Sequence, residues 1–162
     1  MVAVKLGSDA AGEIASGDAT ARLWDATTGQ QIAALLGHED GLTSACFSRD
    51  GARILTASYD RTARRWDGTT GKEITALRRH EDGVTGACFF SPDGARIVTT
   101  SSDRTTRLWD AATSQQIVRI ALDAAVTMVS VHAGMIALND RLGRFHVFEA
   151  ETFLSAKDSV SG

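Results

Sequence analysis

The sequence predicts an all-β fold built from one repeated antiparallel sheet. Apolar runs such as ARILTAS and ARIVTTS are short, and turn signals such as RDG, TTG and PDG separate them. No segment keeps the i, i+3, i+4, i+7 spacing of an amphipathic helix over three turns. The third observation is an internal repeat, because Trp-Asp pairs recur at Trp24, Trp66 and Trp109, at intervals of 42 and 43 residues.

Each repeat has room for four short strands and their turns. In the second copy we expect strands at residues 42–48, 53–57, 62–66 and 73–77. Gly51 and Gly71 fall in turns of this copy that need a positive φ. Both faces of such a sheet carry apolar residues, so it must stack against the sheets of the neighbouring repeats. The repeats occupy about residues 1–36, 37–78, 79–121 and 122–156, followed by a tail at 157–162, and the fourth copy is degraded.

The composition narrows the functional classes. The chain has 162 residues, of which 43% are hydrophobic and 23% charged, which fits one globular domain or a piece of one. A net charge of −3 argues against a general nucleic-acid or anionic-membrane binder. No apolar stretch approaches 18 residues, and the N-terminus lacks a signal-peptide pattern. Two cysteines form no disulfide framework, so we expect a cytoplasmic protein.

Further shared residues reveal a family resemblance. The segments LGHEDGLTSACFS and RRHEDGVTGACFF place His38 and His80 ahead of two of the Trp-Asp pairs, and Asp60 and Asp103 lie in the turns before those pairs. A Gly-His start, a turn Asp and a Trp-Asp end with a period near 42 resemble the WD-repeat β-propeller family over nearly the whole chain. The resemblance implies a β-propeller of four-stranded antiparallel blades, with four blades per chain.

Four blades are fewer than most rings of this family contain, so the two ends of the chain should present apolar sheet faces. We expect the chain to begin in the innermost strand of its first blade. The expected end faces are Val2, Val4, Leu6 and Ile14 in the first blade and Val129, Val131, Ile136, Phe145 and Val147 in the fourth. A homodimer arranged head to tail would close an eight-bladed ring. The alternative is that a longer parent chain or another protein supplies the missing blades.

The resemblance also implies a buried chain of hydrogen bonds in each complete repeat, running from the Trp indole through a serine hydroxyl and the loop histidine to the turn aspartate. The residues are Trp66, Ser58, His38 and Asp60 in the second repeat and Trp109, Ser101, His80 and Asp103 in the third. The first repeat keeps Trp24, Ser16 and Asp18 without a histidine. The fourth has Asp123 and Phe148 at the His and Trp positions, so no such network should form there.

Ser58, His38 and Asp60 resemble a catalytic triad, but their recurrence in the next repeat and the lack of an oxyanion hole favour a structural role. We therefore expect no enzyme activity, no cofactor and no metal site. Cys46 and Cys88 should be small buried side chains. His132 and His146 stand alone on strands, and Arg22, Arg64 and Arg107 should cover apolar blade edges with their long stems.

One end of the predicted blades carries mixed charges that suit protein binding. This rim consists of Glu39, Asp40, Tyr59, Arg61, Glu81, Asp82, Ser102 and Arg104. The sequence thus predicts a non-catalytic protein-interaction scaffold of the WD-repeat type, with itself and a protein or peptide as partners and with no nucleic acid or membrane partner. The alternatives are a sensory or regulatory propeller segment of a larger signalling protein, and a small-ligand or sugar binder that uses the central channel.

Overall fold

The computed structural model describes residues 2–6, 19–91, 93–132 and 134–149, with side chains from residue 19 onward. Within these ranges every regular element is a β-strand, which confirms the all-β prediction. No helix in the described ranges is long and apolar enough to cross a membrane.

The strands form four antiparallel sheets in chain order, which we number from the N-terminus. Sheet 1 contains β1 (Val2–Leu6), β2 (Ala21–Asp25) and β3 (Gln31–Leu35). Sheet 2 contains β4 (Leu42–Phe47), β5 (Arg53–Ser58), β6 (Thr62–Asp67) and β7 (Glu73–Arg78). Sheet 3 contains β8 (Val84–Phe89), β9 (Arg96–Ser101), β10 (Thr105–Asp110) and β11 (Gln116–Ala121). Sheet 4 contains β12 (Val126–His132), β13 (Met135–Asp140) and β14 (Phe145–Glu149).

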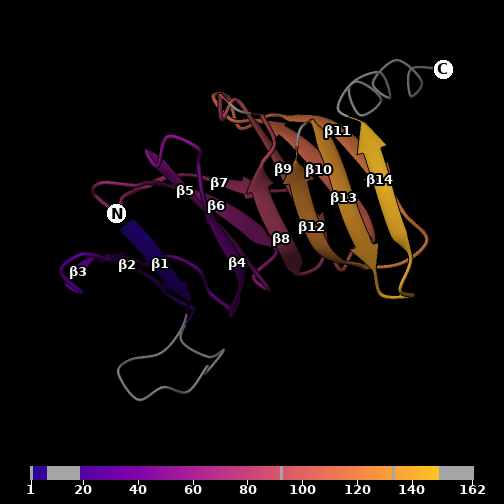
Figure 1. The fold of residues 1–162 in the computed structure, drawn as a ribbon. Coiled ribbons are helices and arrows are strands. Elements are labelled where there is room, and N and C mark those ends of the chain that lie inside the picture. The colour runs from indigo at the N-terminus through magenta and orange to yellow at the C-terminus, as the bar shows by residue number, and fades with distance from the viewer. Residues whose placement is uncertain (1, 7–18, 92, 133, 150–162) are drawn as a thin grey trace.

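Sheets 2 and 3 confirm the predicted four-stranded antiparallel unit, and the four strands of sheet 2 match their predicted ranges to within one residue. The sheets stack from sheet 1 to sheet 4 without closing a ring among the described residues (Figure 1). An eight-bladed ring would therefore need further blades and stays a proposal.

The place of β1 differs from the sequence-based expectation. Val2–Leu6 was expected as the innermost strand, but β1 pairs directly with β2, the strand that carries Trp24. In sheets 2 and 3 that neighbouring place belongs to the second strand of the repeat. A short strand with alternating apolar residues can pair with any open strand edge, so the sequence pattern alone does not choose the neighbour. Ile14, Ser16 and Asp18 lie outside the described residues.

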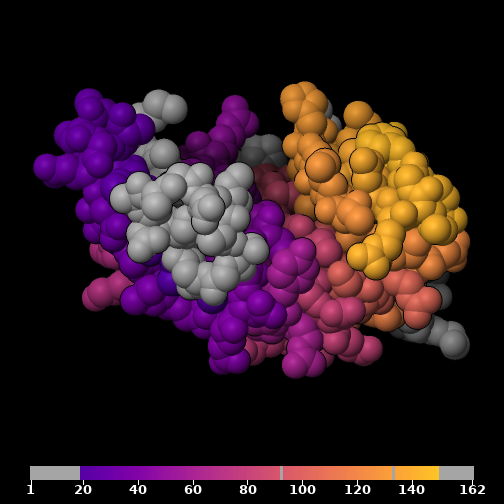
Figure 2. All heavy atoms as spheres, turned by 90° about the horizontal axis from the view of Figure 1, so that it is seen from below, coloured from indigo at the N-terminus to yellow at the C-terminus, as the bar shows by residue number. Residues whose placement is uncertain are grey.

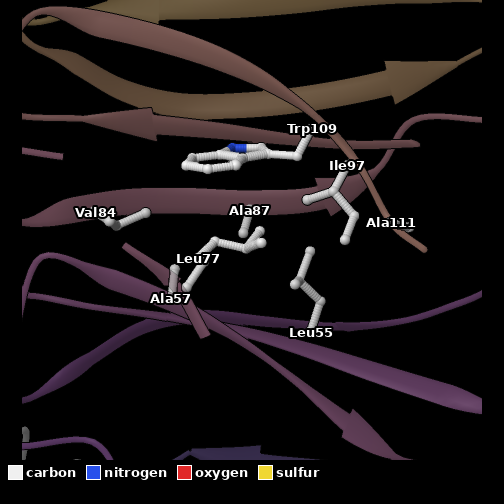
Figure 3. Close-up of a cluster of buried hydrophobic side chains, with 9 residues drawn as sticks. Leu55, Ala57, Leu77, Val84, Ala87, Ile97, Trp109 and Ala111 are labelled. Carbon is white, nitrogen blue, oxygen red and sulfur yellow. The ribbon is translucent and has the colours of Figure 1, made fainter. Parts of the chain in front are cut away.

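A separate hydrophobic core fills each junction between neighbouring sheets. Trp66 packs with Leu23 and Leu35 between sheets 1 and 2. Between sheets 2 and 3, the indole of Trp109 lies above Ala87 and Leu77 (Figure 3). The third junction contains Leu108 and Val118 from sheet 3 and Val126, Ile136 and Leu138 from sheet 4. Trp66 and Trp109 thus face the preceding sheet, whereas the residue before a tryptophan faces the following sheet, as strand alternation requires.

A β-bulge at the start of each inner strand links neighbouring sheets by a hydrogen bond. The register shifts between Leu42 and Ser44 in β4 and between Val84 and Gly86 in β8, which leaves one threonine out of the pairing in each strand. Thr43 Oγ1 donates to the carbonyl of Val84 at 2.6 Å, and Thr85 Oγ1 donates to that of Val126 at 2.6 Å. A bulge changes the direction of one side chain, and here it turns the threonine side chain toward the next sheet.

The same bulge in β12 corrects the predicted outer face of sheet 4. The register shifts between Val126 and Met128, so the alternation of the strand reverses after Thr127. Val129 and Val131 consequently pack against the core shared with sheet 3, and Ile136, to which Val131 pairs, is fully buried there. These three residues were expected on the outer face, and that expectation is wrong.

Phe145 and Val147 do face outward, because they pair with residues of β13 on the side opposite Ile136. They share this outer face with Met128 and Met135, and all four side chains are exposed.

Candidate functional site

A buried chain of hydrogen bonds joins the tryptophan of sheet 2 to the turn between β5 and β6. Trp66 Nε1 donates to Thr56 Oγ1 at 2.9 Å, and His38 Nε2 lies 2.8 Å from the same oxygen. His38 Nδ1 lies 2.7 Å from Asp60 Oδ2. Because the ionised Asp60 can only accept, the imidazole donates to it through Nδ1, and Nε2 of the neutral ring then accepts the hydrogen of the threonine hydroxyl.

Sheet 3 repeats this arrangement with nearly the same geometry. Trp109 Nε1 donates to Thr99 Oγ1 at 2.8 Å, and His80 Nε2 lies 2.8 Å from that hydroxyl. His80 Nδ1 lies 2.8 Å from Asp103 Oδ2. The two networks tie strands two and three of each sheet to the loop that enters it.

The serines do not occupy the place expected for them. Ser58 Oγ donates to the carbonyl of Asp40 and accepts from the amide of Asp60, and Ser101 makes the equivalent contacts in sheet 3. The hydroxyl between tryptophan and histidine therefore belongs to Thr56 and Thr99, two residues earlier. Trp66 pairs with Ile54, so Thr56 is its diagonal neighbour on the same face, whereas Ser58 lies about 7 Å further along the strand.

Burial and hydrogen bonding fix the protonation states of these networks. Burial lowers the pKa of His38 and His80, although the neighbouring aspartates act in the opposite direction. Burial alone would raise the pKa of Asp103, but hydrogen bonds from Thr105 and His80 outweigh it and lower the pKa to about 2. The pKa of Asp60 is lowered in the same way by Thr62 and His38. At neutral pH each network thus contains a neutral histidine beside an ionised aspartate.

Two arginines extend the networks and were expected elsewhere. Arg64 and Arg107 are buried, not spread along apolar blade edges. Arg64 contacts Glu73 at 2.6 Å and Asp60 at 3.9 Å. Arg107 donates to Gln116 at 2.7 Å and lies 3.7 Å from Asp103. Their position two residues before a tryptophan puts them on its face of the strand, and that spacing was the available signal.

The first and fourth repeats depart from this pattern. Trp24 Nε1 is buried and has no hydrogen-bond partner among the described residues. In sheet 4, Asp140 accepts hydrogen bonds from Arg144 Nε at 2.7 Å and from His146 Nε2 at 3.1 Å. His146 therefore does not stand alone, as the sequence suggested. Arg144 also reaches Asp123 at 3.4 Å, so a different polar cluster occupies this repeat.

The predicted rim lies at the end of the molecule where β13 turns into β14, and Figure 2 views this end from below. Its members are exposed, except for the half-buried Ser102. Arg61 and Arg104 have positive φ values of 69° and 64° in the turns that follow Asp60 and Asp103. In sheet 4 the positive φ of this turn belongs to Gly143. The exposed Arg141, which the sequence analysis missed, takes the place of Tyr59 and Ser102, because its amide donates to the carbonyl of Ala125 as theirs donate to Gly41 and Gly83.

The buried networks hold the rim loops in place. The amides of Glu39 and Glu81 donate to the same aspartate oxygens that the histidines contact, at 3.1 and 3.0 Å. The ring of Tyr59 lies against Gly83, where a Cβ atom would come within 2.7 Å of the ring. The exposed Tyr59 side chain thus lies beside the entry loop of sheet 3. Side chains held on fixed turns suit the recognition of another protein.

The hydroxyl that contacts His38 is the fully buried Thr56, not an accessible serine nucleophile. Residues 29–67 and 71–110 each match the family model for the WD domain, G-beta repeat, and both matches end at a Trp-Asp pair. The chain belongs to the WD-repeat family. WD repeats generally mediate contacts between proteins and are typically non-catalytic. A comparison with curated proteins found no match.

Proposed function

We propose that this WD-repeat protein is a non-catalytic scaffold that binds a protein partner at its rim and completes its ring with a second copy of itself. The observation that carries the ring closure is the outer face of sheet 4. Phe145 is 67% exposed and Met128 is 61% exposed there. An apolar sheet face of this kind is covered in the three junctions between the sheets of this chain and favours association when it is open.

Thr127 supports the nature of the missing neighbour. It occupies the bulge of β12, as Thr43 and Thr85 do in the two inner strands before it. Those two donate to the first carbonyl of the next inner strand, whereas Thr127 is exposed and donates within sheet 4 to the carbonyl of Asn139 at 3.1 Å. Sheet 4 therefore has the bulge threonine that bonds to the next sheet at the other junctions, so we infer that another WD-type sheet covers it.

A second copy of this chain is the simplest source of such a sheet, because its own sheets already stack in this manner. Two copies related by a two-fold axis would cover both open ends and give an eight-bladed ring. A longer parent chain or a different WD-repeat protein would cover the same face without a homodimer. The oligomeric state of the isolated chain distinguishes these cases.

The test of ring closure compares two exposed apolar residues of the β13–β14 hairpin. Phe145→Asp places a charge on the outer face and should convert the dimer to a monomer or an aggregate. Leu142→Asp is the matched control, because Leu142 is 68% exposed in the turn between the strands. Sedimentation velocity should therefore show a changed mass for Phe145→Asp only. A wild-type monomer, or equal effects of both variants, would contradict the proposal.

The rim is tested separately with a cross-linked partner identified for the wild-type protein. Tyr59→Ala and Arg104→Ala should weaken capture of that partner, because both side chains are exposed at fixed turns. Their unfolding free energy should change by no more than about 0.5 kcal/mol, as is usual for exposed positions. A partner that binds both variants as tightly as the wild type would exclude the rim as the contact surface.

A further inference from the structure

A cavity of about 690 Å³ lies between sheets 2 and 3 at the end of the molecule opposite the rim. It is bounded by the β4–β5 turn, the β8–β9 turn and the segment after β10. Three arginines line it, namely Arg49, Arg53 and Arg65. The rim, by contrast, is built from the turns at the other ends of the same strands.

Arg65 interrupts the repeat pattern at this junction. The residue before the tryptophan faces the next sheet, and in the first and third repeats it is Leu23 and Leu108, both fully buried. In the second repeat the same place holds arginine. A cation in a position designed for leucine costs desolvation energy without adding to the core, so the exception points to a role other than packing.

The charge of Arg65 has no ion-pair partner among the described residues. One guanidinium nitrogen donates to the carbonyl of Ala111, but the buried Nε atom has no hydrogen-bond partner. No carboxylate of the described residues comes within ion-pair distance of it. Burial and the neighbouring charge of Arg53 lower the pKa of Arg65 and outweigh the charge of Asp110, which acts in the opposite direction. A nearby anion would relieve both effects.

The two acidic residues of the cavity are already engaged by their own turns. Asp50 accepts from Ser48 Oγ at 2.6 Å and from the amide of Ala52 at 2.9 Å. Asp93 accepts from the amide of Ala95 at 3.0 Å. Arg53 has a 3.5 Å contact with Asp67 outside the cavity lining, and Arg49 is exposed without an ion pair among the described residues. These hydrogen bonds lower the pKa of both aspartates and keep them ionised, so the lining carries three arginines against two aspartates, a surplus of one positive charge.

A second cavity of about 620 Å³ adjoins the first and is mainly apolar. The two share Arg49 and Phe89, and the second also contains Phe47, Phe90 and Val131. A groove with arginines in one part and aromatic rings in the next fits a ligand with an anionic group close to an apolar one. The aspartates of the first cavity would repel a multiply charged phosphate more than a single carboxylate.

We propose that this groove, formed by both cavities and here called the arginine groove, binds an acidic peptide segment. A carboxylate of the peptide lies between Arg65, Arg53 and Arg49, and a neighbouring apolar side chain enters the compartment of Phe47 and Phe90. The guanidinium fork suits a carboxylate through paired hydrogen bonds. The arginine groove is separate from the rim and independent of ring closure.

The test uses a short fluorescein-labelled synthetic peptide in which Asp and Glu alternate with Phe and Leu, and its counterpart with Asn and Gln. Fluorescence anisotropy should show binding of the acidic peptide that is about tenfold tighter than that of the amide counterpart, the loss expected for one charge-assisted hydrogen bond. Binding should weaken with added salt. Equal binding of the two peptides, or no binding at millimolar peptide, would overturn the proposal.

Variants locate the binding. Arg65→Leu restores the residue of the other repeats, so it should fold normally and lose about tenfold in affinity, and Arg49→Gln should weaken binding without affecting the core. Arg104→Gln at the rim is the matched control and should bind like the wild type. Unchanged affinity in Arg65→Leu would refute the assignment. Competition by inorganic phosphate as strong as that of the unlabelled peptide would also refute it, because it would indicate a site for small anions.

Discussion

Replacing Thr56 with valine removes one hydroxyl from the buried network of sheet 2 while leaving the shape of the side chain nearly unchanged. Thr56 is fully buried, and its Oγ1 atom is the partner of both Trp66 Nε1 and His38 Nε2. The variant therefore leaves two buried polar atoms without partners. An unsatisfied buried group costs about 1–3 kcal/mol, so the loss of partners for two such atoms in Thr56→Val should lower the free energy of unfolding by about 2–6 kcal/mol.

Urea unfolding monitored by tryptophan fluorescence measures this loss, at one protein concentration for all variants. Ser58→Ala is the informative companion, because Ser58 contacts only the backbone of Asp40 and Asp60. It should cost less than Thr56→Val. A smaller loss for Thr56→Val than for Ser58→Ala would show that the serine, and not the threonine, carries the network.

Two further predictions follow from the ionisation of buried groups. The pKa of His38 and His80 lies below the ordinary value of 6.5, so the unfolded chain takes up protons that the folded chain does not as the pH falls below about 6.5. The free energy of unfolding should thus decrease from pH 7.5 to pH 5, and greater stability at pH 5 than at pH 7.5 would contradict the lowered pKa of the histidines. The free energy of unfolding should fall again below about pH 4 as Asp103, with a pKa of about 2, approaches protonation. Cys46 and Cys88 are half-buried, and desolvation raises the pKa of Cys46 to about 11 and of Cys88 to about 12. A thiol reagent at pH 8 should therefore react with both much more slowly before urea unfolding than after it, and equal rates would refute the raised pKa values.

The positions of the strands could be predicted from the sequence. For some strands, however, the sequence did not show which residues face the core and which face outward. The turn signals located β4 to β7 to within one residue. The bulge at Thr127 reverses the alternation of β12 and turns Val129 and Val131 inward. A bulge adds one residue to a strand without a distinctive composition, so a simple period of two assigns the wrong face beyond it.

The residues of the candidate site could be predicted at positions where the hydrogen-bond network requires one residue type. They could not be predicted at positions that several residue types can fill. An indole donor, an imidazole and a turn carboxylate stood out as repeated Trp, His and Asp. The bridging hydroxyl could come from Thr56 or Ser58, because both lie on the same face of β5, and only the register with Trp66 decides between them. Arg65 was visible as a departure from Leu23 and Leu108, but its meaning depended on the cavity that the folded sheets create.

The mass of the wild-type protein in solution tests the central claim most directly, namely that the open junction of sheet 4 is covered by a second copy of the chain. Sedimentation equilibrium at about 10 μM should give about twice the 17.2 kDa of one chain. This mass would mean that a second copy supplies the sheet that covers Thr127 and Phe145. A stable species of 17.2 kDa up to about 100 μM would contradict the claim.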